Sequence, residues 1–377
     1  MGNSRLAPRR AFDLADFMRP ALALLVLLLA TPLRSAPPAI HSPEVLPDRR
    51  VTFRVKLPKA HEVKVQGDQH LEVTLTKGED DLWSATVGPL EPSVYGYSLV
   101  VDGLSILDPG NPWFKPEPGE HTSAFLVPGE PPLLHERQDT PHGVLHLHEY
   151  TSAPSGVVRR LRVYTPPGYE HQVQRGYPVL YLLHGSGDNE ATWSEFGRAH
   201  VILDNLIAQK KAVSMIVVMP DGHMPSTGGQ PAPGERLKSF ELDVLENILP
   251  LVEHTYRVKA GPTHRAICGL SMGGVQSFSI GLRHPDFFAW VGGMSAFVPD
   301  AETLCAEGLN DPKINEKFAL FWDQIGKDDM LLKKNEEFEA VLDKHSIKHH
   351  YQLTEGSHAW PVWRNYLAEF APLLFQE

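Results

Sequence analysis

Cysteine is scarce in this chain of 377 residues, which contains only Cys268 and Cys305. Two cysteines cannot provide the disulfide framework that stabilises many small secreted folds. Cys268 lies in an apolar segment, where we expect a buried free thiol rather than a bridge.

Positive charge is also in deficit, because the 35 basic residues are outnumbered by 46 acidic residues and the net charge is −11. Nucleic acid selects basic surfaces, so we do not expect this chain to bind it.

Long apolar segments are missing after the N-terminal region. Residues 21–30 (ALALLVLLLA) form a short apolar run after a start made positive by Arg5, Arg9 and Arg10, whereas a bilayer span needs about 20 residues. A basic start before a short apolar run is typical of a signal peptide, although Asp13 and Asp16 are unusual there. We expect residues 1–36 to be a signal peptide, the protein to be secreted or periplasmic, and no stable membrane insertion to remain after signal removal. An uncleaved N-terminal anchor is the alternative.

Short segments that alternate apolar and polar residues follow the signal. Residues 51–57 (VTFRVKL) have the period of two that is typical of a strand with one buried face. Similar segments recur at 61–65, 71–76, 82–87 and 94–101. This spacing predicts an all-β, immunoglobulin-like sandwich over residues 38–128. The proline-rich stretch 129–142 is then a linker.

From residue 143 the pattern changes to strands alternating with helices. Apolar strand-like runs occupy 157–164, 177–183, 215–219, 266–269 and 318–325, and helical spacing occupies 201–210, 242–256 and 275–283. Such alternation predicts an α/β unit over residues 143–377 with a mostly parallel sheet covered on both faces. In sheets of this kind the catalytic groups gather at the carboxyl ends of the strands.

The segment 269–273 (GLSMG) matches the G-x-S-x-G elbow that carries the nucleophile of α/β-hydrolases. A predicted strand precedes it and a predicted helix follows, which makes Ser271 the expected nucleophile rather than part of an ordinary tight turn. In this fold the acid and then the histidine come later in the chain. His358, in a loop of small residues, is the expected base. His345, His349 and His350 are alternatives that we place on the solvated surface.

The acid that orients the histidine is expected after the strand at 318–325, where Asp328 and Asp329 are adjacent. Only one of them can point toward the imidazole, and the residues alone leave the choice open. The oxyanion needs two N–H donors. We expect them to be the backbone groups of Met272, which follows the nucleophile, and of Ser186, in the loop after the strand at 177–183.

Other aromatic and imidazole side chains are expected to have structural roles. His146 and His148 alternate on a predicted strand without an evident third ligand, so we expect no metal site there. In the β-unit, core packing is favoured over a sugar-stacking platform for Trp83, Tyr95, Tyr97 and Trp113. Trp360 is either a core residue or part of the pocket mouth that contacts substrate, and the sequence leaves both open.

Residues 140–375 resemble the esterase D-like group that includes carbohydrate esterase family 1, the feruloyl and acetylxylan esterases. The resemblance rests on the segments 181–185 (YLLHG), 197–208 (GRAHVILDNLIA), 219–222 (MPDG), 264–274 (HRAICGLSMGG) and 358–364 (HAWPVWR). In that family the acid ends a G-x-x-D turn, which implies Asp329, and the histidine stands where His358 lies. The leading unit resembles the early-set β-sandwich of glycogen-branching enzymes through segments 101–103, 107–109 and 111–112.

The resemblance implies a serine esterase that hydrolyses feruloyl or acetyl esters on plant polysaccharide such as xylan, without a metal or organic cofactor. Its partner is then a polysaccharide or a small-molecule ester. An esterase for a siderophore such as enterochelin is the alternative of the same class, because those enzymes also join a β-domain to a hydrolase. A catalytically inactive glycan-binding protein is the alternative of another class. Since every expected catalytic residue follows the linker, we expect residues 135–377 to act alone on small esters.

Overall fold

The structure is a computed structural model, and it describes residues 40–376 apart from 118, 120–121 and 226–232. The expected signal peptide lies outside the described residues, so secretion stays a prediction. Within the described ranges, no helix is both long and apolar enough to cross a membrane.

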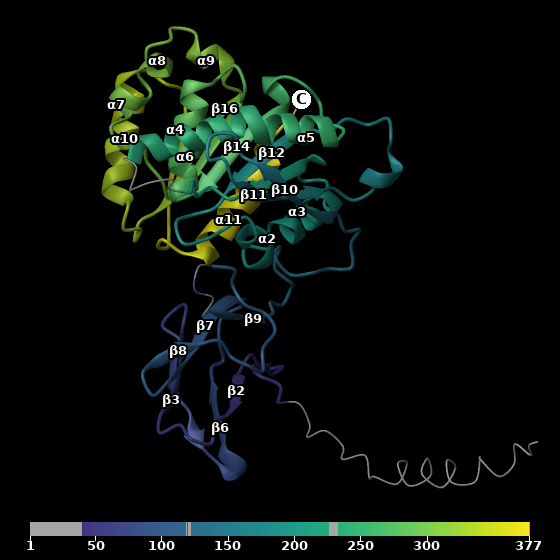
Figure 1. Cartoon of the computed structure of the whole chain (residues 1–377), viewed down its shortest axis with the longest axis vertical. Helices are drawn as coiled ribbons and strands as arrows, with labels where there is room; N and C mark the ends of the chain where they lie inside the picture. Colours follow the sequence, from purple (N-terminus) through teal and green to yellow (C-terminus); the bar gives the residue numbers. More distant parts are fainter. Residues whose placement is uncertain (1–39, 118, 120–121, 226–232, 377) are drawn as a thin grey trace, which may run out of the picture. The chain divides into compact units, whose positions relative to one another are not determined.

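The first unit is a sandwich of two antiparallel sheets (Figure 1). One sheet has the order β1 (Glu44–Val45), β2 (Val51–Lys56), β6 (Leu82–Val87), β5 (Thr76–Lys77). The other has the order β4 (Glu72–Thr74), β3 (Val63–Gly67), β7 (Ser93–Val101), β8 (Leu104–Ile106), and β9 (Ser123–Val127) also pairs with β7. A 3-10 turn, η1 (Glu79–Asp81), precedes β6. The predicted all-β unit is confirmed.

Aromatic side chains fill the space between these two sheets. Phe53 from β2 contacts Tyr97 from β7 and Phe125 from β9, with ring centroids 5.1 and 5.7 Å apart. Tyr95 stacks on Phe125, and Trp83 is only 6% exposed. Core packing therefore accounts for these rings, and a sugar-stacking platform built from Trp83, Tyr95 and Tyr97 is ruled out.

The second unit contains an eight-stranded sheet, and most of its neighbouring strands run parallel. Only the pairs β10–β11 and β11–β13 are antiparallel. The order is β10 (Val144–Thr151), β11 (Val158–Thr165), β13 (Ile216–Pro220), β12 (Val179–Leu183), β14 (Arg265–Leu270), β15 (Trp290–Met294), β16 (Leu320–Gly326), β17 (His350–Thr354). The predicted α/β class with a mostly parallel sheet is confirmed.

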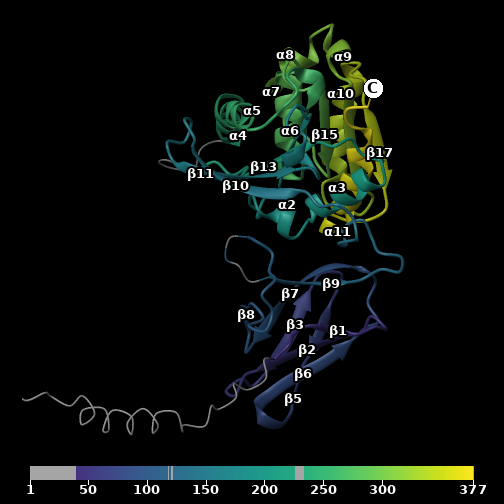
Figure 2. The same ribbon diagram turned by 90° about the vertical axis from the view of Figure 1, so that its right-hand side faces the viewer.

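Helices cover both faces of this sheet (Figure 2). Side chains of β12 alternate between two apolar cores, with Tyr181 in one and Leu182 in the other. The first core contains residues of α4 (Pro233–Asp243), η3 (Val244–Ile248), α5 (Leu249–Thr255), α6 (Met272–Arg283) and α10 (Leu332–Lys344). The second contains residues of α2 (Thr192–Glu195), α3 (Ala199–Ala208) and α11 (Trp360–Phe370). Continuous apolar strands such as β12 are thereby buried on both sides.

Short helices complete the connections between the strands. They are α7 (Ala301–Leu304), α8 (Ala306–Leu309), α9 (Ile314–Lys317), η2 (Tyr169–His171), η4 (Pro262–His264) and η5 (Ala371–Leu373). The helix expected over 242–256 starts earlier, in α4, and passes through one turn of π-helix, η3. Pro250 in α5 explains that turn, because its ring would collide with the carbonyl of Glu246 in regular α-helical geometry.

The segment 129–142 is attached to α3. The side-chain amide of Asn205, which is fully buried, donates to the carbonyl oxygens of Leu134 (2.8 Å) and Glu136 (2.9 Å). The Asp204 carboxylate accepts the backbone N–H of Gly143 at 2.9 Å. Buried polar groups that are satisfied in this way fix the path of the chain, so the segment joins the two units without being a free tether.

One histidine of the second unit gives a pH-dependent contribution to stability. The His349 ring lies 2.8 Å from the Glu339 carboxylate, and this hydrogen bond raises the pKa of His349 from 6.5 to about 9. A raised folded-state pKa contributes stability that is complete below pH 6.5 and is lost as the pH rises through about 9. The melting temperature of His349→Gln should fall below that of the wild type at pH 6, and the two should converge near pH 10. The exposed His171 supplies the control, His171→Gln; a deficit of the same size at both pH values would contradict this assignment.

Candidate active site

Ser271 occupies the sharp turn between β14 and α6. Its backbone has φ 50° and ψ −117°, a left-handed conformation that is strained for any residue other than glycine. The backbone N–H of Ser271 donates to the carbonyl of Met294 at the end of β15, at 2.9 Å. The turn is therefore held by the sheet, and it presents the serine hydroxyl to the adjacent cavity.

Glycine is required two residues before and two residues after Ser271. A Cβ on Gly269 would lie 2.5 Å from backbone atoms of Gly273. A Cβ on Gly273 would lie 2.6 Å from the carbonyl oxygen of His184. Both distances are shorter than van der Waals contact, so the G-x-S-x-G spacing is a steric requirement of this strand–turn–helix junction.

The expected histidine and acid lie beside the serine. His358, between β17 and α11, accepts the Ser271 hydroxyl at Nε2 (3.0 Å) and donates from Nδ1 to the Asp329 carboxylate (2.9 Å). Asp329 follows β16 and is 6% exposed, whereas Asp328 is exposed. The structure thus brings together Ser271, His358 and Asp329 in the arrangement of a catalytic triad. The other candidate bases lie elsewhere: His345 pairs with Glu302, and His349 pairs with Glu339.

The Asp329 carboxylate has two further partners besides His358. It accepts the backbone N–H of Leu331 at 2.8 Å, and it also interacts with the Ser295 side chain. Burial alone would raise the pKa of Asp329, but the hydrogen bonds from His358, Leu331 and Ser295 outweigh it and lower that pKa. The Ser295 hydroxyl in turn accepts the indole N–H of Trp363 at 3.0 Å. Ser295 was missed from the sequence, and its position directly after β15 is the signal that would have found it.

His184 fixes the start of the loop that follows β12. The backbone N–H of Gly222 donates to His184 Nε2 at 2.8 Å, so the proton of the neutral ring is on Nδ1. Nδ1 donates to the carbonyl of Gly185 at 2.8 Å. These contacts explain why the HG and MPDG motifs occur together, since the ends of β12 and β13 are joined through this ring.

Ser186, the expected second oxyanion donor, lies in the turn that follows. The N–H of Asp188 donates to the Gly185 carbonyl at 3.2 Å, and Gly187 has φ 89°, which only glycine adopts readily. A Cβ on Gly185 would lie 3.5 Å from the Ser271 Cβ. The loop therefore passes directly beside the nucleophile. Met272 is the first residue of α6, where helix N–H groups have no intrahelical partner.

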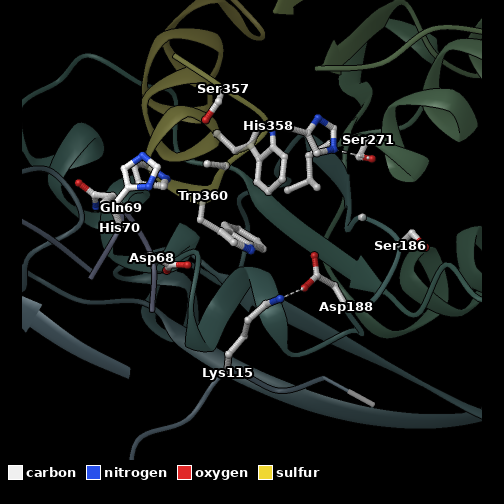
Figure 3. Close-up of a pocket in the computed structure, with 15 residues that line it drawn as sticks. Asp68, Gln69, His70, Lys115, Ser186, Asp188, Ser271, Ser357, His358 and Trp360 are labelled. Atoms are coloured by element: carbon white, nitrogen blue, oxygen red, sulfur yellow. Dashed lines mark hydrogen bonds and ion pairs between the residues drawn. The ribbon is translucent and has the colours of Figure 1, made fainter. Parts of the chain in front are cut away.

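A cavity of about 510 Å³ opens above Ser271 and His358, within the usual range of small-molecule sites, roughly 300–1,000 Å³. Figure 3 shows that four labelled residues of its wall come from the first unit, namely Asp68, Gln69, His70 and Lys115. No motif or periodicity in the sequence pointed to these four residues. They lie in loops of the β-unit that are far from Ser271 and His358 in the sequence and line the same cavity in the folded chain.

Trp360 combines the two roles that the sequence left open. It is 7% exposed and packs edge-on against Trp193 and Trp363 at 5.1 and 5.5 Å, yet it also lines the cavity (Figure 3). Trp363 packs perpendicular to the His358 ring at 4.9 Å. Trp360 is therefore mainly a core residue with one part of its ring at the cavity wall.

The remaining candidates make structural contacts. His146 contacts the Thr165 hydroxyl at 3.0 Å and His148 contacts the Tyr256 hydroxyl at 2.5 Å. Among the residues that the structure describes, no group of three or more histidine, cysteine, aspartate or glutamate side chains is arranged to hold a metal ion. Cys268 and Cys305 are both buried free thiols.

A mostly parallel sheet, a serine elbow and a histidine hydrogen-bonded to both serine and aspartate define an α/β-hydrolase. Residues 152–330, which lie in the second unit, match the family described as "Putative esterase". The resemblance noted in the sequence is confirmed.

Relatives make the family assignment more specific. The endo-1,4-beta-xylanase/feruloyl esterase of Xylanibacter ruminicola is 30% identical over 348 residues, which cover 90% of this chain and 46% of the relative. This chain thus spans less than half the length of that relative. A CE1 ferulic acid esterase from Anaeromyces mucronatus is 26% identical with a TM-score of 0.55, over 64% of this chain and 94% of that chain. The second unit is therefore similar to feruloyl esterases of the CE1 kind.

The enterobactin esterase from Shigella flexneri has the same fold. Its TM-score is 0.61 at 18% identity, over 86% of this chain and 92% of that chain. At this identity the likeness concerns the fold alone.

The triad geometry predicts unequal effects for two neighbouring aspartates. Ser271→Ala and His358→Ala should each lower kcat on p-nitrophenyl acetate by several orders of magnitude, because the nucleophile or its base is removed. Asp329→Asn should also lower kcat strongly, since it removes the charge that stabilises the protonated His358. Asp328→Asn is the matched control and should retain most activity. A larger loss for Asp328→Asn than for Asp329→Asn would overturn the assignment of the acid.

Proposed function

We propose that this protein is a serine esterase that hydrolyses carboxylic esters through an acyl-enzyme. His358 Nε2 takes the proton of the Ser271 hydroxyl as the oxygen attacks the ester carbonyl. Asp329 holds the ring by its Nδ1–H and stabilises the imidazolium. The N–H groups of Met272 and Ser186 receive the oxyanion. His358 then protonates the leaving alcohol. Water attacks the acyl-enzyme while His358 Nε2 takes its proton, and His358 returns that proton to the Ser271 oxygen as the acid leaves. The observation that carries this proposal is the continuous hydrogen-bonded chain from Ser271 to Asp329 at the floor of an open cavity.

The substrate that we propose is a feruloyl or acetyl ester on a plant polysaccharide. The relative from Xylanibacter ruminicola, described as a xylanase and feruloyl esterase, aligns with 90% of this chain and so with both units. The ring of Trp360 at the cavity wall provides an aromatic surface for a planar acyl group. Across the cavity, Asp68, Gln69 and His70 provide polar groups suited to the hydroxyls of a sugar.

A substrate panel tests this proposal directly. Methyl ferulate, acetylated xylan, short p-nitrophenyl esters and enterobactin should be compared by kcat/KM, with Ser271→Ala as the blank. We expect turnover of a feruloyl or acetyl polysaccharide ester to exceed that of enterobactin. Preference for enterobactin would support the siderophore alternative. If no ester is hydrolysed and a fluorophosphonate does not label Ser271, the protein is an inactive glycan-binding relative.

Trp360 distinguishes an aromatic acyl group from a small one. Trp360→Ala should raise KM for methyl ferulate several-fold more than for an acetyl ester, because stacking is worth on the order of 1 kcal/mol and only the larger group reaches the ring. The variant should also melt at a lower temperature, since the indole packs against Trp193 and Trp363. Trp360→Phe keeps an aromatic ring in the core and is the control for stability. Equal changes in KM on both esters would restrict Trp360 to its packing role.

A further inference from the structure

The segment 113–117 of the first unit lies along the chain that follows the oxyanion loop of the second. The indole N–H of Trp113 donates to the carbonyl of Glu195 at 3.2 Å. The hydroxyl of Thr192 donates to the carbonyl of Pro116 at 2.8 Å. Between these two contacts, Lys115 projects toward the cavity (Figure 3).

Lys115 forms an ion pair with a carboxylate of the catalytic unit. Its Nζ lies 3.0 Å from Asp188 Oδ1 and 3.0 Å from Glu117 Oε2 of its own segment. The Asp188 side chain is 5% exposed and the Lys115 side chain 18% exposed. In Figure 3 the two side chains point toward one another below Trp360, on the side of the cavity where Ser186 and Ser271 lie. A pair at this depth is poorly screened by solvent.

Asp188 is part of the turn that carries Ser186. Its backbone N–H closes the turn onto Gly185, and a Cβ on Gly185 would lie 3.5 Å from Asp188 Oδ2. The Asp188 side chain therefore lies close to Gly185, in the same closed turn as Ser186. An unpaired buried carboxylate at this place would also oppose the negative charge that develops on the substrate oxygen.

We propose that Lys115 of the β-unit is a positioning residue for ester hydrolysis, which acts through Asp188 to hold the 185–188 turn and to neutralise the carboxylate beside the oxyanion donors. This proposal rests on the proposed role of the Ser186 N–H. It also revises the expectation that residues 135–377 act alone, because removal of the β-unit would take away the cation that compensates Asp188.

The protonation equilibria of the two groups agree with this geometry. Burial raises the pKa of Asp188 above its ordinary value, and the Lys115 ammonium acts against that rise. Burial alone would lower the pKa of Lys115, but the charges of Asp188 and Glu117 outweigh it and raise that pKa. The pairing therefore favours the charged form of both groups.

The test is the kinetics of Lys115→Met in the full-length protein on p-nitrophenyl acetate. This ester contains no sugar, so the result is independent of which acyl polysaccharide is the natural substrate. We expect kcat to fall by about tenfold to a hundredfold, the scale of a small displacement in a catalytic loop, while KM stays within about threefold. Lys115→Arg should restore most of the loss. Lys64→Met, which removes another ion-paired lysine of the β-unit, should retain wild-type kinetics.

Asp188→Asn removes the other partner of the Lys115–Asp188 ion pair, from the second unit. This variant keeps the proposal testable if Lys115→Met folds poorly. Because both substitutions act through one pair, the double variant should be no slower than Lys115→Met alone. Losses that multiply, an unchanged kcat in folded Lys115→Met, or a change confined to KM would each overturn the proposal. Wild-type protein that lacks activity on p-nitrophenyl acetate would instead reject the proposed esterase function, so the two failures are distinguishable.

Discussion

The close contact of two backbone segments at Ser271 is the constraint on which the rest of the site depends. A Cβ on Gly269 would collide with the backbone of Gly273, and a Cβ on Gly273 would collide with the backbone at the end of β12. Ser271 between them is held in a strained conformation. Such strain persists only where the surroundings over-determine it. Here the parallel sheet supplies that support, because the serine N–H is bonded to the end of β15. The nucleophile is thus placed by the backbone, and the other catalytic groups are positioned around it.

The elements that define this site could be predicted because their signals are local. The strands before Ser271 and Asp329 are apolar runs of ordinary length, and each of these residues follows the carboxyl end of its run. His358 instead follows β17 (HYQLT), which is largely exposed. The choice between Asp328 and Asp329 shows the limit of that reasoning. The two neighbours are equivalent in any pattern, and the family resemblance favoured Asp329. In the structure the same choice is a matter of burial, because Asp329 turns inward to His358 while Asp328 remains exposed.

Other parts of the site could not be predicted because they depend on contacts between distant segments. Ser295 has no motif, and it becomes relevant only because Trp363 and Asp329 converge on its hydroxyl. Lys115 lies in a stretch with no regular period, and its partner Asp188 is 73 residues away, as their numbers show. Apolar periodicity predicts which face of a helix or strand is buried, but it does not predict which turn of one unit contacts which loop of the other. The proline content of segment 129–142 favoured the interpretation as a free linker, since it indicates turns without indicating that they pack against α3.

The charges around the cavity connect these observations. Negative groups are needed below His358, where Asp329 stabilises an imidazolium, and they are harmful near the oxyanion donors, where negative charge develops on the substrate. The chain meets both requirements with carboxylates of different partners: Asp329 is bonded to the histidine, whereas Asp188 is bonded to a lysine. Because that lysine comes from the β-unit, the proposed role of Lys115 makes the charge beside the proposed oxyanion donors depend on a unit that contains none of Ser271, His358 and Asp329. On this proposal, the hydrogen bonds of Trp113, Thr192 and Asn205 that attach the two units also serve to place the lysine that neutralises Asp188.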